Sequence, residues 1–449
     1  MNRITLVVIS MFAVGSAFAA DRPQNLLELY KQAQSSDSAW AAARSTHAAA
    51  QEKLVQGKAL TLPTVTLNAN ANHANTDLEY RSGGTGGFRQ GGGTESFETY
   101  GYSVNVNHPL YRRQNQIQFE EAKTQVSQAD EQLSTANLDL MTRTSQAYFD
   151  VLLAQDKIDL IEAQKAAITK QLEQAKANFE VGTATITDVH EAQARFDLLI
   201  AQDIAARNDL EVRKRAIQSI IGQMPGALAS AKESLAVAIP APQDMEKWVE
   251  MAEQKNPQLI YQQKALTLAT QEIERTHAGH LPTLDAVGSY SDSRANGSAT
   301  GIGSDTQNFT IGLQLQVPIY QGGAISSRER EAAINQQTAK DQLEQARREV
   351  GLQTRQAYLN VASAVAQVKA YEQALASSQS SLDSTSLGYE VGVRTSVDVL
   401  NAQQQYYSAK RDLLQARYTW LLSVIKLKAA AGLLTEDDLA ATSSMLAGS

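Results

Sequence analysis

The sequence contains an imperfect internal duplication, and this duplication limits the folds that the chain can adopt. Residues 179–189 are FEVGTATITDV, and residues 389–399 are YEVGVRTSVDV, 210 positions later. The same offset relates Gly222 to Gly432. Repetition at a fixed offset indicates two copies of one structural unit. We therefore expect two similar halves, each with a glycine-containing break in a long helical pattern.

A heptad pattern predicts one very long helix before each break. From Ala122 to Phe179, fifteen of the seventeen core heptad positions are apolar, and many of them are alanine. The second copy keeps thirteen of seventeen apolar positions between Ala332 and Tyr389. Heptad spacing is typical of coiled coils, and a helix of about 65 residues would be roughly 100 Å long. Helices of this length must pack against other helices, from the same chain or from sister chains.

Shorter helical patterns complete each half of the chain. One follows each break, at about 188–221 and 398–431, and one precedes the strands of each half, at about 24–60 and 244–279. Each half is therefore predicted to contain a helix, two strands, a long helix, a break and a final helix.

Four segments alternate between apolar and polar residues, as strands with two different faces do. The predicted strands are 64–71, 99–107, 284–291 and 309–317. Their length, their uncharged polar face and the aromatic residues near their ends favour strands that cross a membrane. Four strands are too few for a closed membrane barrel, and an open edge in lipid would leave backbone groups unpaired. We therefore expect the chain to oligomerise, and a trimer would supply twelve strands.

Composition excludes several functional classes. The chain has no cysteine, which removes disulfides, thiol catalysis and thiolate metal sites. The net charge of -8 argues against nucleic acid as a partner. No constellation of side chains suggests catalysis, so the protein is predicted to be neither an enzyme nor a carrier of a cofactor or metal.

The N-terminus predicts a secretory signal over residues 1–19. The evidence is Arg3, the apolar run after it and Ala17-Phe18-Ala19.

Taken together, these features resemble the TolC family of trimeric outer-membrane exit ducts. The resemblance covers nearly the whole mature chain and depends most on the two break motifs. Four shorter motifs flank the strand pairs: Leu62-Pro63-Thr64, Leu281-Pro282-Thr283, Pro109-Leu110-Tyr111 and Pro318-Ile319-Tyr320. The family implies a mainly α-helical fold with a transmembrane β part. In it, a trimeric twelve-stranded β-barrel, with four strands per chain, is continued by a long α-helical coiled-coil barrel.

The resemblance also implies a location in the outer membrane, extending into the periplasm, and a set of partners. These are outer-membrane lipid, a periplasmic adaptor protein, and an inner-membrane transporter of the ABC or the proton-driven type. The cargo implied is protein, through type I secretion, small toxic compounds, or both. The alternative is a periplasmic adaptor protein, which also has a signal and coiled-coil hairpins.

The resemblance and the duplication together divide the chain into five segments. These are a signal peptide at 1–19, a first repeat at 20–222, an equatorial linker at 223–245, a second repeat at 246–432 and a C-terminal equatorial segment at 433–449.

The two break motifs would form the closed periplasmic tip, and the resemblance assigns roles within them. Asp188, Tyr389 and Arg394 are the gate candidates, because family members hold the tip closed through matching residues. Asp398 and Asn401 match the two positions of an aspartate ring that binds cations, although the second position is an asparagine here. Two further roles follow from local chemistry. Gly182 and Gly392 supply the tip turns, and both aspartates match a helix capping box with a preceding threonine.

Overall fold

The computed structural model describes residues 23–78, 93–230, 235–299 and 302–446. The predicted signal over 1–19 and most of the glycine-rich segment 82–93 lie outside these ranges. The chain divides into two compact units. The helical unit comprises the described parts of Met1–Ala41, Ala136–Ala252 and Leu352–Ser449, and the strand unit comprises those of Ala42–Thr135 and Glu253–Gly351.

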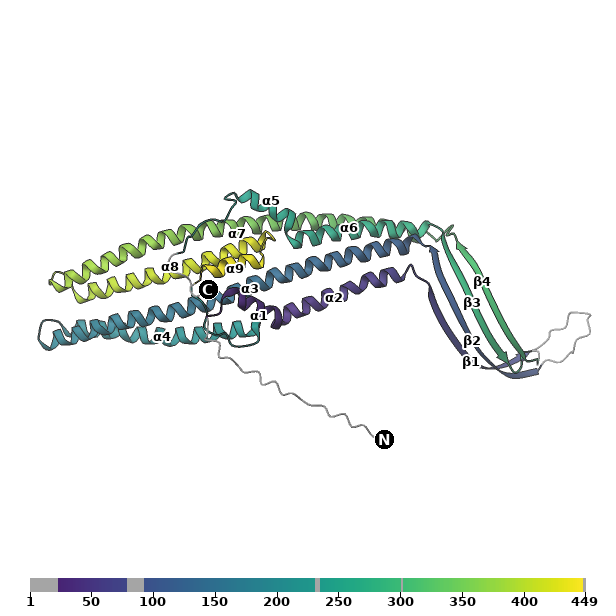
Figure 1. Ribbon diagram of the computed structural model, residues 1–449, viewed down its shortest axis with the longest axis horizontal. Helices are drawn as coiled ribbons and strands as arrows, with labels where there is room; N and C mark the ends of the chain where they lie inside the picture. The colour runs from purple at the N-terminus through teal and green to yellow at the C-terminus, as the bar shows by residue number, and fades with distance from the viewer. Residues whose placement is uncertain (1–22, 79–92, 231–234, 300–301, 447–449) are drawn as a thin grey trace, which may run out of the picture. The chain divides into compact units, whose positions relative to one another are not determined.

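The strand unit contains one antiparallel sheet in the order β1-β2-β3-β4 (Figure 1). Its strands are β1 (Thr64–Leu78), β2 (Gly93–Tyr111), β3 (Thr283–Ala295) and β4 (Ser304–Gln316). All four predicted strands are confirmed. The first three strands are longer than predicted, and β4 is shifted toward its hairpin, because the backbone ladder continues where the alternation of apolar and polar residues is lost.

Cross-strand register gives the sheet two distinct faces. On one face, Leu67 pairs with Val104, Val104 with Tyr290, and Tyr290 with Phe309. The next row, on the opposite face, contains only polar uncharged residues: Thr66, Asn105, Ser289 and Thr310. The apolar face is open to solvent in the single chain, where Leu67 is 70% and Phe309 76% exposed. Among the described residues, β1 and β4 each have one strand neighbour, so each leaves one edge unpaired.

Two helical hairpins dominate the helical unit. The first hairpin is formed by α3 (Arg113–Glu180) and α4 (Ile186–Ile221), and the second by α7 (Ala324–Glu390) and α8 (Ser396–Ala430). The two longest helices, α3 and α7, contain 68 and 67 residues, which confirms the heptad prediction. Their N-terminal parts belong to the strand unit.

Each of the two predicted helices that precede the strands is in fact a pair. The first splits into α1 (Leu26–Ser36) and α2 (Ser38–Ala59), and the second into α5 (Met245–Lys255) and α6 (Pro257–His277), which a short 3₁₀ turn at Ala278–His280 follows. The prediction of single helices was wrong because a capping residue interrupts each one.

Asp37 and Asn256 are these interrupting residues. Both have extended backbone angles, and their side-chain oxygens accept hydrogen bonds from Trp40 N at 2.7 Å and from Gln258 N at 2.9 Å. Pro257 fits only the first turn of a helix, so the second break is fixed by the backbone as well.

A further helix, α9 (Glu436–Ser444), lies in the segment that the sequence predicts only as equatorial. It is short and carries no long hydrophobic period, so periodicity alone could not indicate it. Leu439 of α9 is fully buried, and Ser443 Oγ accepts a hydrogen bond from Leu27 N at 3.2 Å. This helix therefore packs against α1.

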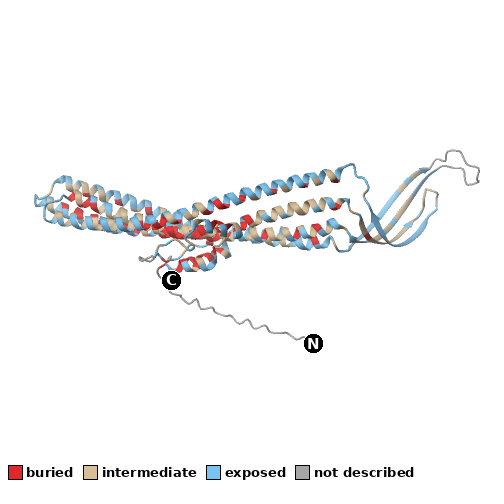
Figure 2. Ribbon diagram, turned by 90° about the horizontal axis from the view of Figure 1, so that it is seen from above, coloured by how far each residue is buried: buried red, intermediate tan, exposed pale blue. Residues whose placement is uncertain are grey.

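Burial follows the facing sides of the helices, whereas the strands are mostly exposed or half-buried (Figure 2). Alanines of the predicted seam, such as Ala154 and Ala175, are buried, as small residues at close helix contacts should be. The two charged seam residues are both paired: Arg143 binds Asp37 at 3.1 Å, and Lys165 binds Asp203 at 3.4 Å. Among the described residues, none of the helices is apolar over a long enough stretch to span a membrane.

Candidate functional site at the helical breaks

The two breaks have nearly the same backbone. Gly182 and Gly392 have φ values of 78° and 80°, a region in which residues with a side chain are disfavoured. The following residues close the turn: Thr183 N donates to Asn178 O at 2.8 Å, and Val393 N donates to Gly388 O at 2.9 Å. Both long helices thus end in the same left-handed turn.

A capping box starts the helix after each turn. Thr185 N donates to Asp188 Oδ2 at 2.9 Å, and Asp188 N donates to Thr185 Oγ1 at 3.3 Å. Thr395 and Asp398 form the same pair, at 2.9 and 3.2 Å. Hydrogen bonds from the Thr395 backbone and hydroxyl, followed by the nearby charge of Arg394, lower the pKa of Asp398. Both aspartates therefore have a capping role within one chain.

The structure does not bring the three gate candidates together within one chain. The Tyr389 hydroxyl accepts a hydrogen bond from Asn178 Nδ2 at 3.1 Å and donates none to Asp188. The Arg394 side chain lies over Gly388, where an added Cβ would come within 2.7 Å of Arg394 Cγ. Among the described residues, Asp188 forms no hydrogen bond or ion pair with Tyr389 or Arg394. Tyr389 nevertheless links the second hairpin to the first.

Arg195 forms a second link between the hairpins, and it lies outside both break motifs. Its Nη2 donates to Asn401 Oδ1 at 3.1 Å, and its Nη1 donates to Gln404 Oε1. Its Nε donates to Glu191 Oε1 at 3.2 Å on the same helix. The candidate ring residue Asn401 is therefore engaged by a guanidinium of its own chain.

A third link is buried. Gln171 Nε2 of α3 donates to Ser396 Oγ of α8 at 3.3 Å, and both residues are buried. Neither the break motifs nor the heptad pattern singles out Gln171, Asn178 or Arg195. A comparison of the two copies could have indicated these positions, because the counterparts 210 positions later are different residues: Ser381, Gly388 and Gln405. The two copies thus differ at all three positions.

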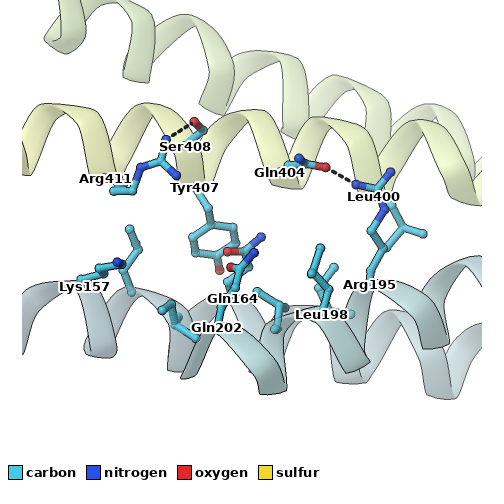
Figure 3. A pocket seen from close by; sticks show the side chains of 14 residues that line it. Lys157, Gln164, Arg195, Leu198, Gln202, Leu400, Gln404, Tyr407, Ser408 and Arg411 are labelled. Atoms are coloured by element: carbon cyan, nitrogen blue, oxygen red, sulfur yellow. Dashed lines mark hydrogen bonds between the residues drawn. The ribbon is translucent and has the colours of Figure 1, made fainter. Parts of the chain in front are cut away.

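A cavity of about 150 Å³ lies between α3, α4 and α8 (Figure 3). Figure 3 shows Arg195 with Gln404 at one end and Arg411 with Ser408 at the other, where the hydrogen bond is 2.9 Å long. Tyr407 lies between them and donates to Ala163 O at 3.2 Å. An apolar cluster of Ile168, Leu172, Ala192, Leu199 and Leu400 joins the same three helices, and Ile168, Leu199 and Leu400 also line the cavity. The hairpins therefore meet through a small apolar core with polar links around it.

Comparison with known proteins identifies the class to which this architecture belongs. Residues 29–223 and 248–433 match the family model described as outer membrane efflux protein. The outer membrane protein TolC of Vibrio cholerae is 34% identical over 429 residues, covering 95% of this chain and 94% of that protein. The alkaline protease secretion protein AprF of Pseudomonas aeruginosa is 30% identical over 416 residues, covering 92% and 85%.

The fold is also found among solved structures. The outer membrane protein VceC from Vibrio cholerae superposes with a TM-score of 0.74 at 19% identity, covering 91% of this chain and 96% of that one. The architecture and these relatives define an outer-membrane channel for export. The chain belongs to the outer membrane efflux protein family. It is located in the outer membrane and serves as an exit duct, and the alternative of a periplasmic adaptor is not supported.

Proposed function

We propose that three copies of the chain assemble into one duct, a twelve-stranded β-barrel continued by a coiled-coil barrel. The unpaired edges of β1 and β4 support this proposal most strongly. Each edge would pair with the opposite edge strand of a neighbouring copy and close the ladder. The apolar face, which includes Leu67 and Phe309, would then contact lipid, and the Thr, Asn and Ser face would line a wet lumen.

Exposed apolar residues on α4 of the first hairpin and on α7 of the second hairpin support the same assembly. In α4, Ile204 is 66% exposed, and in α7, Leu352 is 64% exposed and Leu359 follows seven residues later. A seven-residue interval is typical of a coiled-coil seam. In a closed ring of hairpins, α4 of one copy would pack against α7 of the next.

The duct would act together with a periplasmic adaptor and an inner-membrane transporter of the ABC or proton-driven type. The names of the relatives support this arrangement, since one is a protease secretion protein and the family is defined by efflux. Protein and small toxic compounds are both cargo of such ducts. The duct itself would catalyse no reaction and carry no cofactor, and its energy would come from the transporter.

The five-segment division of the chain is part of this proposal. The signal at 1–19 would direct export, the repeats at 20–222 and 246–432 would each supply one strand pair and one hairpin, and the segments at 223–245 and 433–449 would surround the middle of the helical barrel. Hydrogen bonds from Tyr148 to Ala229 O at 2.8 Å and from Leu27 to Ser443 support a packed belt at that level.

We assign gating to the tips. Asp188, Tyr389 and Arg394 would hold the periplasmic end closed, with Gly182 and Gly392 forming the turns. Tyr389 already crosses between hairpins within the chain, and the exposed Arg394 guanidinium is available to Asp188 of an adjacent copy. Such bonds are repeated three times in a trimer, so modest single contributions would keep one state dominant.

A cation ring formed by Asp398 and Asn401 is a weaker part of the assignment. Asp398 supplies one carboxylate per chain, whereas Asn401 supplies none. A conductance titration with a trivalent cation would compare the wild type with Asp398→Asn. The ring predicts that the variant is blocked less, and an equal block in both would eliminate it.

The function is tested in planar bilayers with the assembled protein. Outer-membrane fractions should give a trimer band on gels that disappears on heating. The double variant Arg394→Ser with Tyr389→Phe should raise the single-channel conductance severalfold, because the tip loses both links. Arg417→Ser is a matched control, since Arg417 binds Glu372 at 3.2 Å within the second hairpin. Monomeric protein would contradict the duct, and unchanged conductance of the double variant would contradict the gate.

A further inference from the structure

We propose that Arg195 is a positioning residue for the gate, which ties the two hairpins of one chain together outside the break motifs. This inference rests on the proposed function, because a link of this kind affects transport only if the hairpins move apart on opening. The link joins α4 to the N-terminal third of α8, beyond the turn and cap of the second tip.

The geometry of the guanidinium suits this role. All three nitrogens of Arg195 are used: Nε by Glu191 at 3.2 Å, Nη2 by Asn401 at 3.1 Å, and Nη1 by Gln404. Glu191 lies one turn earlier on α4 and holds the fork in place. The other two acceptors lie one turn apart on α8, a spacing that the planar fork of a guanidinium spans with a fixed geometry.

The surroundings make this link important for the local contact between hairpins. Arg195 forms one end of the cavity of about 150 Å³, so side-chain packing between α4 and α8 is incomplete there (Figure 3). Atoms that border a void lose dispersion contacts on that side. Hydrogen bonds therefore contribute to the contact between α4 and α8 where side-chain packing is incomplete.

In each chain, the donor of this link lies in the first hairpin and its acceptors lie in the second, and the duplication does not repeat it. The counterpart of Arg195 in the second copy is Gln405, and the counterpart of Gln404 in the first copy is Ala194. The first hairpin thus supplies the donor and the second supplies both neutral acceptors. A link with neutral acceptors should depend little on ionic strength, unlike an ion pair at the tip.

The same helix provides a matched control residue. Arg207 of α4 donates to Asp203 at 2.8 Å and to Glu162 of α3 at 2.5 Å, so it connects the two helices of the first hairpin only. Arg207→Met removes the same chemical group as Arg195→Met and keeps the same apolar stem. Of these two substitutions, only Arg195→Met removes a bond between the hairpins.

The test compares these variants as assembled trimers in planar bilayers. Arg195→Met should raise the open probability on the order of tenfold, which corresponds to the loss of one or two net hydrogen bonds. Arg207→Met should leave it unchanged. Gln404→Ala should give an intermediate rise and add little to Arg195→Met in the double variant, as expected for two partners of one bond. Trimer bands and melting temperatures should be equal in all four proteins.

Three results would overturn the inference, and they are distinguishable. If Arg195→Met and Gln404→Ala both behave as the wild type while Tyr389→Phe with Arg394→Ser opens the channel, the gate stands and Arg195 has no part in it. If none of the variants opens the channel, the gate itself is wrong, and the role of Arg195 fails with it. If Arg207→Met opens the channel as much as Arg195→Met, the effect is not specific to the contact between hairpins.

Discussion

The first and second helical tips share a backbone and differ in the contacts of their side chains. Gly182 and Gly392 have the same left-handed φ within 2°, and the same threonine–aspartate box starts the next helix. Tyr389 and Arg394, however, correspond to Phe179 and Ala184. The shared residues build the bend, which both hairpins need. Of the residues that differ, Tyr389 contacts the first hairpin through Asn178, whereas Arg394 lies over Gly388 of its own hairpin.

Burial sharpens this comparison at the second residue after each capping aspartate. Leu400 is 1% exposed and belongs to the apolar cluster that joins α8 to the first hairpin, whereas its counterpart His190 is exposed. The start of the second copy's final helix is therefore enclosed by neighbouring helices. In the first copy, His190 is exposed at this position, although Ala192 two residues later is buried in the same cluster.

The largest expected effect on local stability comes from truncating Leu400. Leu400→Ala should destabilise the contact between hairpins by about 2–5 kcal/mol, because it leaves a cavity in the cluster. Backbone amide exchange over the start of α8 should then become faster by at least roughly thirtyfold. His190→Ala is the matched control and should leave exchange in α4 nearly unchanged. Equal effects at both positions would contradict the contrast between the copies.

The turns, in contrast, should respond alike in the two copies. Gly182→Ala and Gly392→Ala should each cost about 1–2 kcal/mol, since alanine disfavours positive φ. A Cβ at either position meets no atom within 4 Å, so steric crowding adds nothing. Amide exchange of the turn residues measures the cost in each variant. Gly312→Ala, at a site equally open but without positive φ, provides the control. A clear difference between the two tips would show that their turns are not equivalent.

The smallest effect expected is a pH dependence at the second cap. The pKa of Asp398 is lowered in the folded chain, so its cap stabilises the fold above the unfolded pKa of about 4. This stabilisation is lost as the pH falls through the lower folded value. Melting temperatures of the wild type and Asp398→Asn should therefore differ at pH 7 and converge toward pH 2. A difference of constant size across this range would rule out the carboxylate as its cause.

Local periodicity was sufficient to predict most of the fold. The heptads between Ala122 and Phe179 and the alternation from Phe309 to Val317 are properties of short windows, and the long helices and the four strands follow from them. The helix break at Asn256 could also have been predicted, since Asn-Pro is a common start to a helix. The break at Asp37 has no proline and a weaker signal.

The candidate site was less predictable, because its contacts join residues far apart in the chain. Arg195 lies 206 and 209 positions from Asn401 and Gln404, and Asn178 lies 211 positions from Tyr389. No local pattern connects such residues. Comparing the two copies position by position identifies where they differ, but packing decides which of the differing residues meet. That comparison, extended a few residues beyond the motifs, would have included Asn178 and Arg195.

The central claim is that residues unlike between the copies keep the tips closed. The most direct test gives the second tip the residues of the first, through Tyr389→Phe with Arg394→Ala, and measures single-channel conductance of the assembled trimer. The claim predicts that the conductance rises severalfold. In the reverse exchange, Phe179→Tyr with Ala184→Arg, the conductance should not rise, because the bond from Asn178 to Tyr389 and the Arg394 side chain are both kept. If the trimer with Tyr389→Phe and Arg394→Ala conducts like the wild type, the claim is contradicted.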